Sequence, residues 1–166
     1  MHRGFTLLEL LITVAVLTAL LLFAAPNLSK VSQQTKMVNL ANEIQGFLIQ
    51  AKSEAVLRNK DLWIHIQGLS TVNVTGNWKM TLTTSSASGT DSLAVFQGDR
   101  YRNIYVRSNR DKIKFDRVMG NPQISGSISI KEAVTDYSLN VSFSNRAGRI
   151  RICSENGVKY GYNQCE

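Results

Sequence analysis

The sequence predicts an α+β fold in which one long N-terminal helix packs on an antiparallel β domain of one or two sheets. Three observations lead to this prediction. Apolar residues run almost unbroken over residues 5–25, and apolar residues then recur at steps of three and four as far as residue 57. After residue 60, short β-rich runs alternate with clusters of Gly, Asn, Ser and Asp. The 166 residues suffice for one domain with a real core in addition to the apolar segment.

A short basic leader, residues 1–4, precedes the apolar segment, whose only charge is Glu9. About twenty residues of helix, at roughly 1.5 Å each, match the thickness of the bilayer hydrocarbon. Residues 5–25 are therefore predicted to span a membrane once, with Arg3 favouring a cytoplasmic N-terminal end and an exported remainder. A carboxylate inside an apolar segment costs a few kcal/mol, so Glu9 needs a partner. An ordinary secretory signal is not expected, because the candidate cleavage site lies before the apolar stretch.

Residues 26–60 follow as an amphipathic helix, after a kink or local break expected at residues 24–27 because of Pro26. Apolar residues at steps of three and four should lie on the sheet: Met37, Leu40, Ala41, Ile44, Phe47, Leu48, Ala51 and Ala55. Polar residues occupy the other face: Lys36, Asn42, Glu43, Gln45, Gln50, Lys52 and Glu54.

Residues 61–166 form the predicted globular β domain. Alternating apolar and polar residues, bounded by turn-forming residues, predict strands near 62–66, 78–83, 92–96, 103–107, 113–118, 124–130, 137–143, 149–153 and 158–160. The sequence shows no internal repeat, long linker or second domain.

Catalysis is not expected. The chain has two histidines, of which His2 belongs to the leader and His65 stands alone within an alternating strand. No nucleophile with a base, no glycine-rich phosphate loop and no cluster with metal-ligand spacing can be assembled. We therefore predict a protein that is not an enzyme and that needs no cofactor or metal.

Two cysteines, Cys153 and Cys165, allow one disulfide and exclude a four-thiolate metal site. Export favours the disulfide. A closed ring of about a dozen residues contributes roughly 3 kcal/mol in the chain-entropy model. The ring contains Asn156-Gly157, a favourable hairpin turn, while Tyr160 and Tyr162 are expected to pack rather than to stack on bases.

Nineteen Lys and Arg against twelve Asp and Glu give a net charge of +7, and the bases form two clusters. The C-terminal cluster contains Arg146, Gly148, Arg149, Arg151 and Lys159. In a strand over residues 149–153, Arg149 and Arg151 would share one face roughly 7 Å apart, which approximates the spacing of phosphates along DNA. Gly148 permits a tight bend just before them. The alternative is a solvated basic turn that keeps the protein soluble.

The other basic cluster contains Arg100, Arg102, Arg107, Arg110, Lys112, Lys114 and Arg117. It is compatible with an extension of a DNA-binding track and with contacts to neighbouring subunits, and the sequence leaves both open. Because no arrangement that reads bases is visible, any DNA binding should involve the backbone, tolerate any sequence and weaken steeply with salt.

Residues 4–9, Gly-Phe-Thr-Leu-Leu-Glu, together with Pro26, resemble the class III signal of type IV pilins and type II secretion pseudopilins. The resemblance implies that a prepilin peptidase cleaves between Gly4 and Phe5 and methylates the new amino terminus. It also implies that Glu9 offsets the amine of a neighbouring subunit's Phe5 in a filament whose core contains residues 5–25.

The strand layout and residues 148–151, Gly-Arg-Ile-Arg, resemble the GspH/FimT group of minor pilins, in which the G-R-x-R motif of naturally competent bacteria lies in a DNA-binding region. The resemblance implies double-stranded DNA, other major and minor pilins, the prepilin peptidase and the inner membrane as partners. It implies an inner-membrane protein with a periplasmic domain that later joins a surface pilus and helps DNA uptake. The alternatives are a structural tip or priming pilin and a type II secretion pseudopilin, neither binding DNA.

Overall fold

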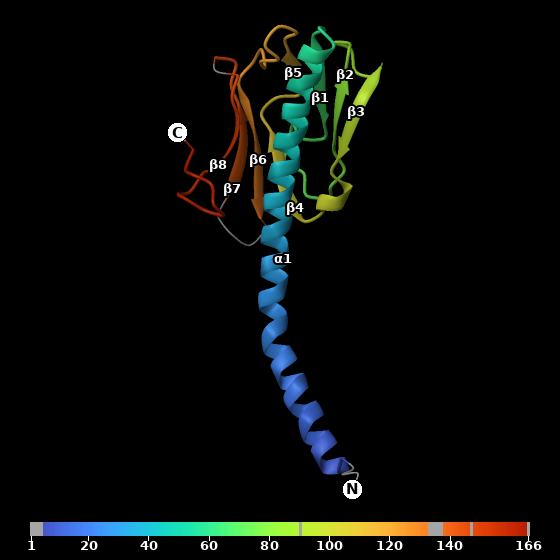
Figure 1. Cartoon of the computed structure of the whole chain (residues 1–166), viewed down its shortest axis with the longest axis vertical. Coiled ribbons are helices and arrows are strands. Elements are labelled where there is room, and N and C mark those ends of the chain that lie inside the picture. Colours follow the sequence, from blue (N-terminus) through green and yellow to red (C-terminus); the bar gives the residue numbers. More distant parts are fainter. Residues whose placement is uncertain (1–4, 90, 133–137, 147, 166) are drawn as a thin grey trace. The chain divides into compact units, whose positions relative to one another are not determined.

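The structure is a computed structural model that describes residues 5–89, 91–132, 138–146 and 148–165, without the side chains of residues 23–30. The chain divides into two compact units, Met1–Thr35 and Lys36–Glu166. Helix α1 (Leu7–Leu57) contributes residues to both (Figure 1).

In the first unit, α1 presents exposed apolar side chains along its described length, from Leu7, 76% exposed, to Leu22, 77% exposed. Its helical conformation continues through residues 24–27. The local break predicted at Pro26 is therefore absent, because a proline removes one backbone hydrogen bond without ending a helix that continues on both sides. Within the described part of the chain, none of the helices combines the length and apolarity that a membrane crossing requires.

In the second unit, the remaining turns of α1 bury the apolar face that the sequence predicts. All eight residues of that face are buried: Met37, Leu40, Ala41, Ile44, Phe47, Leu48, Ala51 and Ala55. These side chains join the inner faces of two sheets in a single hydrophobic core. The period of the sequence therefore identified the buried side of this helix correctly.

Sheet A contains four antiparallel strands in the order β3-β2-β1-β5. Its strands are β1 (Leu62–Gln67), β2 (Lys79–Thr83), β3 (Ser92–Gln97) and β5 (Lys112–Phe115). Ile64 lies opposite both Leu82 and Ile113, and all three are buried, so this row faces the core.

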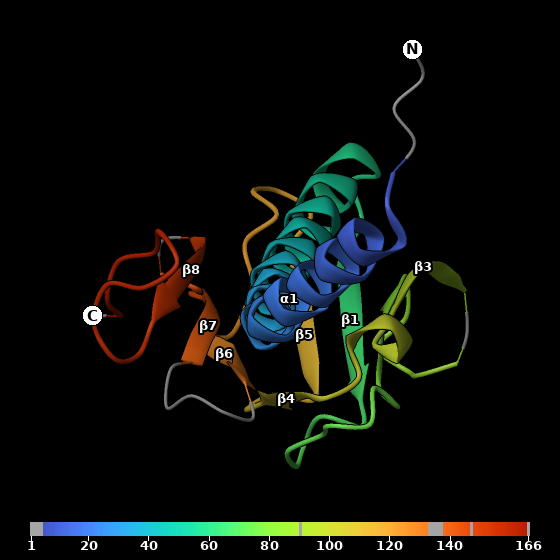
Figure 2. The ribbon, with the colours of Figure 1, turned by 90° about the horizontal axis from the view of Figure 1, so that it is seen from below.

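Sheet B contains four antiparallel strands in the order β4-β6-β7-β8. Its strands are β4 (Ile104–Ser108), β6 (Gly126–Glu132), β7 (Ser138–Phe143) and β8 (Ile150–Ser154). The short helix η1 (Asp99–Tyr101) connects β3 to β4, where the chain passes from sheet A to sheet B. Figure 2 shows strands of both sheets beside α1, which confirms an α+β fold with two antiparallel sheets.

The structure corrects two strand predictions. Residues 158–160 form no strand but a single bridge between Lys159 and Tyr162, because positive φ angles at Gly157 (81°), Tyr160 (53°) and Gly161 (82°) turn the chain repeatedly. The run predicted to reach residue 118 ends at Phe115. There the Asp116 carboxylate accepts hydrogen bonds from the backbone N–H groups of residues 118, 119 and 121 and stabilises a turn.

Candidate functional site

The two arginines of the predicted motif lie on one face of sheet B. Arg151 pairs with Ser142 of β7, and the Ser144 amide donates to the Arg149 carbonyl at 3.0 Å, so the ladder continues one step beyond β8. Ile150 and Ile152 pack against the core from the opposite face. The predicted alternation is therefore confirmed, with the difference that Arg149 precedes β8 instead of beginning it.

Arg149 and Arg151 border a shallow hollow on the outer face of sheet B. Its other lining residues are mostly small and uncharged: Ser127, Asn140, Ser142, Phe143, Ser144, Cys153 and Cys165. The Ser129 hydroxyl donates to the Asn140 side-chain oxygen at 2.6 Å and helps to fix this floor. Among the described residues that line the hollow, the two arginines carry the only charges, and guanidinium groups bind phosphate oxygens well.

The turn before the arginines requires glycine. Gly148 has φ +58°, which L residues rarely adopt, and a Cβ there would collide with the side chain of Asn121. The Lys52 ammonium donates to the Gly148 carbonyl at 3.2 Å and to the Asn121 side-chain oxygen at 3.3 Å. One lysine of α1 thus joins the helix, the loop after β5 and the turn before β8.

Two further residues of α1 hold the C-terminal segment. The Gln45 amide donates to the Ile150 carbonyl at 3.2 Å, and the Tyr162 hydroxyl donates to the Asn42 side-chain oxygen at 2.9 Å. Gln45 follows Asn42 by three positions, and Lys52 follows Gln45 by seven, so the three residues share one side of the helix. We call Asn42, Gln45 and Lys52 the clamp residues. Sequence reasoning placed them on the polar face without a role, although their spacing was a usable signal.

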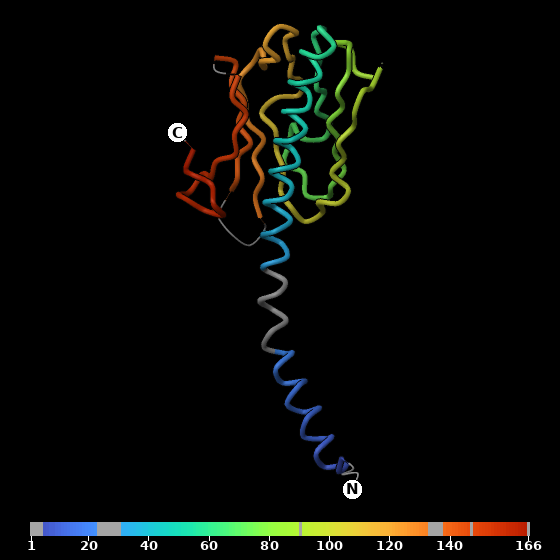
Figure 3. Tube along the Cα trace, viewed as in Figure 1, coloured from blue at the N-terminus to red at the C-terminus, as the bar shows by residue number. Residues whose placement is uncertain are grey.

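Cys153 and Cys165 form the predicted disulfide, and both line the hollow. The chain returns beside the edge of β8, where the Ser154 amide donates to the Asn163 carbonyl and the Cys165 amide to the Ser154 carbonyl, each at 2.9 Å. The disulfide segment thus forms one wall of the arginine hollow. Figure 3 follows this segment after β8 at the edge of sheet B.

The remaining predicted residues lie elsewhere. Arg146 is exposed in the turn between β7 and β8, and Lys159 lies on the disulfide loop; neither lines the arginine hollow. Phe5 is 71% exposed, and Glu9 is exposed in the first turn of α1, where its backbone N–H donates to the Thr6 hydroxyl at 3.3 Å. Gly4, the other residue of the predicted cleavage site, lies outside the described residues.

The other basic cluster is divided between the two sheets. Lys112 and Lys114 belong to β5 of sheet A. Lys114 contacts Asp61 at 2.8 Å and lies over the Trp63 ring, 5.7 Å from its centroid. The hydrogen bond from Lys114 lowers the pKa of the Asp61 carboxyl. Arg107 belongs instead to β4 of sheet B, so this cluster is not one continuous surface.

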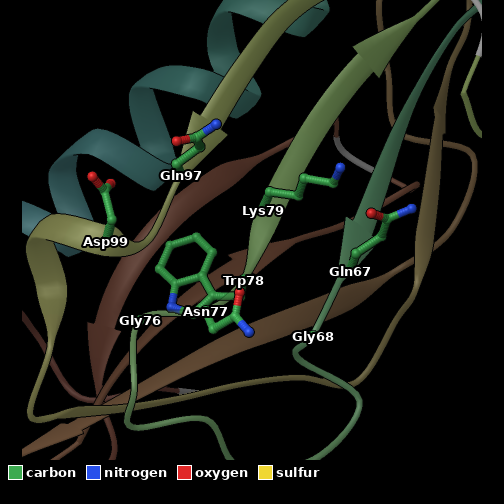
Figure 4. Close-up of a pocket in the computed structure, with 8 residues that line it drawn as sticks. All are labelled: Gln67, Gly68, Gly76, Asn77, Trp78, Lys79, Gln97 and Asp99. Carbon is green, nitrogen blue, oxygen red and sulfur yellow. The ribbon is translucent and has the colours of Figure 1, made fainter.

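A second hollow surrounds Trp78 at one end of sheet A, and none of the predicted site residues lines it (Figure 4). Lys79 and Asp99 give it opposite charges, and the indole of Trp78 is 4% exposed. His65 is also buried, and its Nε2 lies 3.1 Å from the Ser85 carbonyl, which can only accept, so Nε2 donates. Among the described residues, no three His, Cys, Asp or Glu side chains are grouped to hold a metal ion.

The helix, the two antiparallel sheets and the N-terminal motif together define the class of protein as a type IV minor pilin or pseudopilin. The prokaryotic N-terminal methylation motif matches residues 1–25, and the family described as type II transport protein GspH matches residues 40–161. The chain therefore belongs to the GspH family.

Two solved structures of the Pseudomonas aeruginosa type IV minor pilin FimU share this fold. One is 19% identical, with a TM-score of 0.56 over 72% of this chain and 89% of FimU. A second crystal form is also 19% identical, with a TM-score of 0.50 over 68% and 88% of the two chains. None of the curated proteins matches the sequence.

Proposed function

We propose that this minor pilin binds extracellular double-stranded DNA, without sequence preference, for uptake in natural transformation. The observation that carries the proposal is the pair Arg149 and Arg151, which border one hollow with an uncharged, small-residue floor. Residues two apart in an extended chain lie roughly 7 Å apart, close to the spacing of phosphates along one strand. Arg146, Gly148 and Lys159 are assigned supporting roles in the turn and on the adjacent loop.

The proposed contact is to the DNA backbone rather than to the bases. The hollow is bordered by side chains that project from the face of a sheet, whereas base reading requires an element that enters a groove. Phosphate contacts release condensed counterions, so affinity should fall steeply as salt rises.

Maturation and location follow from the same proposal. Prepilin peptidase would cleave between Gly4 and Phe5 and methylate the Phe5 amine, which the methylation motif over residues 1–25 supports. Residues 5–25 would anchor the protein in the inner membrane and later enter the filament core, where Glu9 would offset a neighbouring Phe5 amine. Residues 26–60 would continue as the amphipathic helix, and residues 61–166 would face the periplasm and then the pilus surface.

The test is binding of fluorescent duplex DNA to the full chain in detergent micelles over a salt series. The variant Arg149→Gln, Arg151→Gln removes both arginines, and Lys36→Gln, Lys79→Gln removes two exposed cations that do not line the arginine hollow. We expect the arginine variant to lose about tenfold or more in affinity and about two units of salt slope, because each phosphate contact contributes about 0.9. The lysine variant should bind almost as the native chain does.

Two results would contradict the proposal: no duplex binding by the native chain at low salt, or equal losses in both variants. A purely structural role, as a tip or priming pilin or a type II secretion pseudopilin, would then account for the fold. Copurification with sister pilins and secretion assays would test that role.

A further inference from the structure

The outer face of sheet B carries a second cationic margin opposite the arginines of β8. Along one row across the sheet, Arg107 of β4 lies opposite Ser129 of β6, Ser129 opposite Asn140 of β7, and Asn140 opposite Cys153 of β8. Because cross-strand partners share a face, Arg107 lies on the same face as Arg149 and Arg151. Arg107 is exposed, whereas its neighbours Val106 and Ser108 are buried on the inner face.

The side chains between these margins are small and uncharged. Its floor consists of Ser127, Ser129, Asn140 and Ser142. The Cys165 sulfur lies 3.9 Å from the Asn140 amide, and Asn140 is buried, so the uncharged disulfide lies against the floor beside the arginines of β8. Arg107 and Lys131 border another hollow on this face. Ser129 of β6 and Ser138 of β7 also line it.

Two acidic side chains mark where this surface ends. Glu132 and Glu155 both line the hollow beside Arg107, and Glu155 accepts a hydrogen bond from Ser138. The two carboxylates restrict an anionic ligand to the part of the sheet between Arg107 and the arginines of β8.

The separation of the two margins indicates what kind of nucleic acid fits. From β8 to β4 there are three strand spacings, or about 14 Å. A single strand has one phosphate backbone, whereas a duplex presents two backbones on either side of grooves about 6 and 12 Å wide. Two cationic margins with a neutral floor between them suit two backbones, and arginine side chains are long enough to adjust to the exact separation.

We propose that sheet B binds a duplex across its strands, with Arg149 and Arg151 on one phosphate backbone and Arg107 on the other. This inference rests on the proposed DNA binding and adds that both strands of the duplex are contacted at once. It also answers which residue of the Arg100–Arg117 cluster takes part: Arg107, by its place in sheet B.

The experiment compares Arg107→Gln with the native full chain, in detergent micelles, on a duplex and on a single strand of equal length over a salt series. Lys79→Gln is the matched control, because Lys79 is an exposed strand cation on the outer face of sheet A. We expect Arg107→Gln to weaken duplex binding about three- to tenfold and to lower the duplex salt slope by about 0.9. Its single-strand affinity and slope should equal those of the native chain, and Lys79→Gln should change neither.

The outcomes separate this inference from the proposed function. If Arg149→Gln, Arg151→Gln abolishes duplex binding while Arg107→Gln binds as the native chain does, DNA binding stands and the two-backbone arrangement is wrong. Equal losses of duplex and single-strand binding in Arg107→Gln would also overturn it. If the native chain binds no duplex at low salt, the proposed function fails and this inference fails with it. Thermal melting confirms that each variant is folded.

Discussion

Replacing Gly148 by alanine tests whether the turn before the arginines is held as the structure indicates. Two separate penalties follow from the geometry. An L residue at φ +58° costs about 1–2 kcal/mol relative to glycine. The new Cβ also displaces the Asn121 side chain, which accepts a hydrogen bond from Lys52, and the loss of that bond at a half-exposed site costs about 1 kcal/mol.

Gly148→Ala should therefore destabilise the protein by about 2–3 kcal/mol, which lowers the melting temperature of a chain of this size by roughly 5–10 °C. The measurement is thermal unfolding of the full chain in detergent, followed by circular dichroism. Gly157→Ala is the matched control, because Gly157 also has a positive φ, 81°, but a Cβ there meets nothing within 4 Å. This variant shows the backbone penalty alone.

The double variant Gly148→Ala, Asn121→Ala separates the collision from the loss of the hydrogen bond. Without the Asn121 side chain, the alanine at position 148 has room. The double variant should therefore melt below Asn121→Ala only by the amount that the backbone penalty accounts for. The reasoning is refuted if Gly148→Ala melts no lower than Gly157→Ala.

Three further predictions follow. Lys52→Met should weaken duplex binding with an unchanged salt slope, because Lys52 positions Gly148; a slope lowered by about 0.9 would instead indicate a direct phosphate contact. The double variant Cys153→Ser, Cys165→Ser should lower the free energy of unfolding by about 3 kcal/mol, and treating the native chain with reductant should have the same effect. An unchanged melting temperature would contradict a stabilising disulfide. Burial alone would raise the pKa of the Asp116 carboxyl, but hydrogen bonds from three backbone N–H groups outweigh that effect and lower it. The ionised carboxylate therefore stabilises the fold at neutral pH, and this stabilisation is lost as the pH falls through the lowered pKa. Asp116→Asn should melt lower than the native chain at pH 7, and the difference should shrink in acid; a constant difference would refute this assignment.

Periodic patterns predicted the local parts of the structure. Steps of three and four identified the buried side of α1, and alternation placed Arg149 and Arg151 on one face. Both patterns work because burial repeats with the geometry of the element. The disulfide followed from the presence of two cysteines in a chain for which the sequence predicts export.

Long-range arrangements were beyond local patterns. Lys52 reads as an ordinary polar helix residue, since its partners Asn121 and Gly148 lie 69 and 96 positions further along the chain. The division of the basic cluster depends on β4 joining sheet B while β5 joins sheet A, and strand order is not encoded in alternation. Residues 158–160 resemble a strand in composition, but positive φ angles within and beside them override that preference.

The position of β8 links the basic surface to the pairing of the edge strand of sheet B. β8 is the last strand and occupies an edge, so the order β3-β2-β1-β5 and the row β4-β6-β7 can both form without it. The arginines reach their places only when residues 150–154 pair with β7, and the disulfide closes only when Cys165 lies beside Cys153. A chain that stops before β8 would leave β7 as an open edge, which favours aggregation rather than assembly. The face that carries both arginines therefore forms only once β8 has joined sheet B.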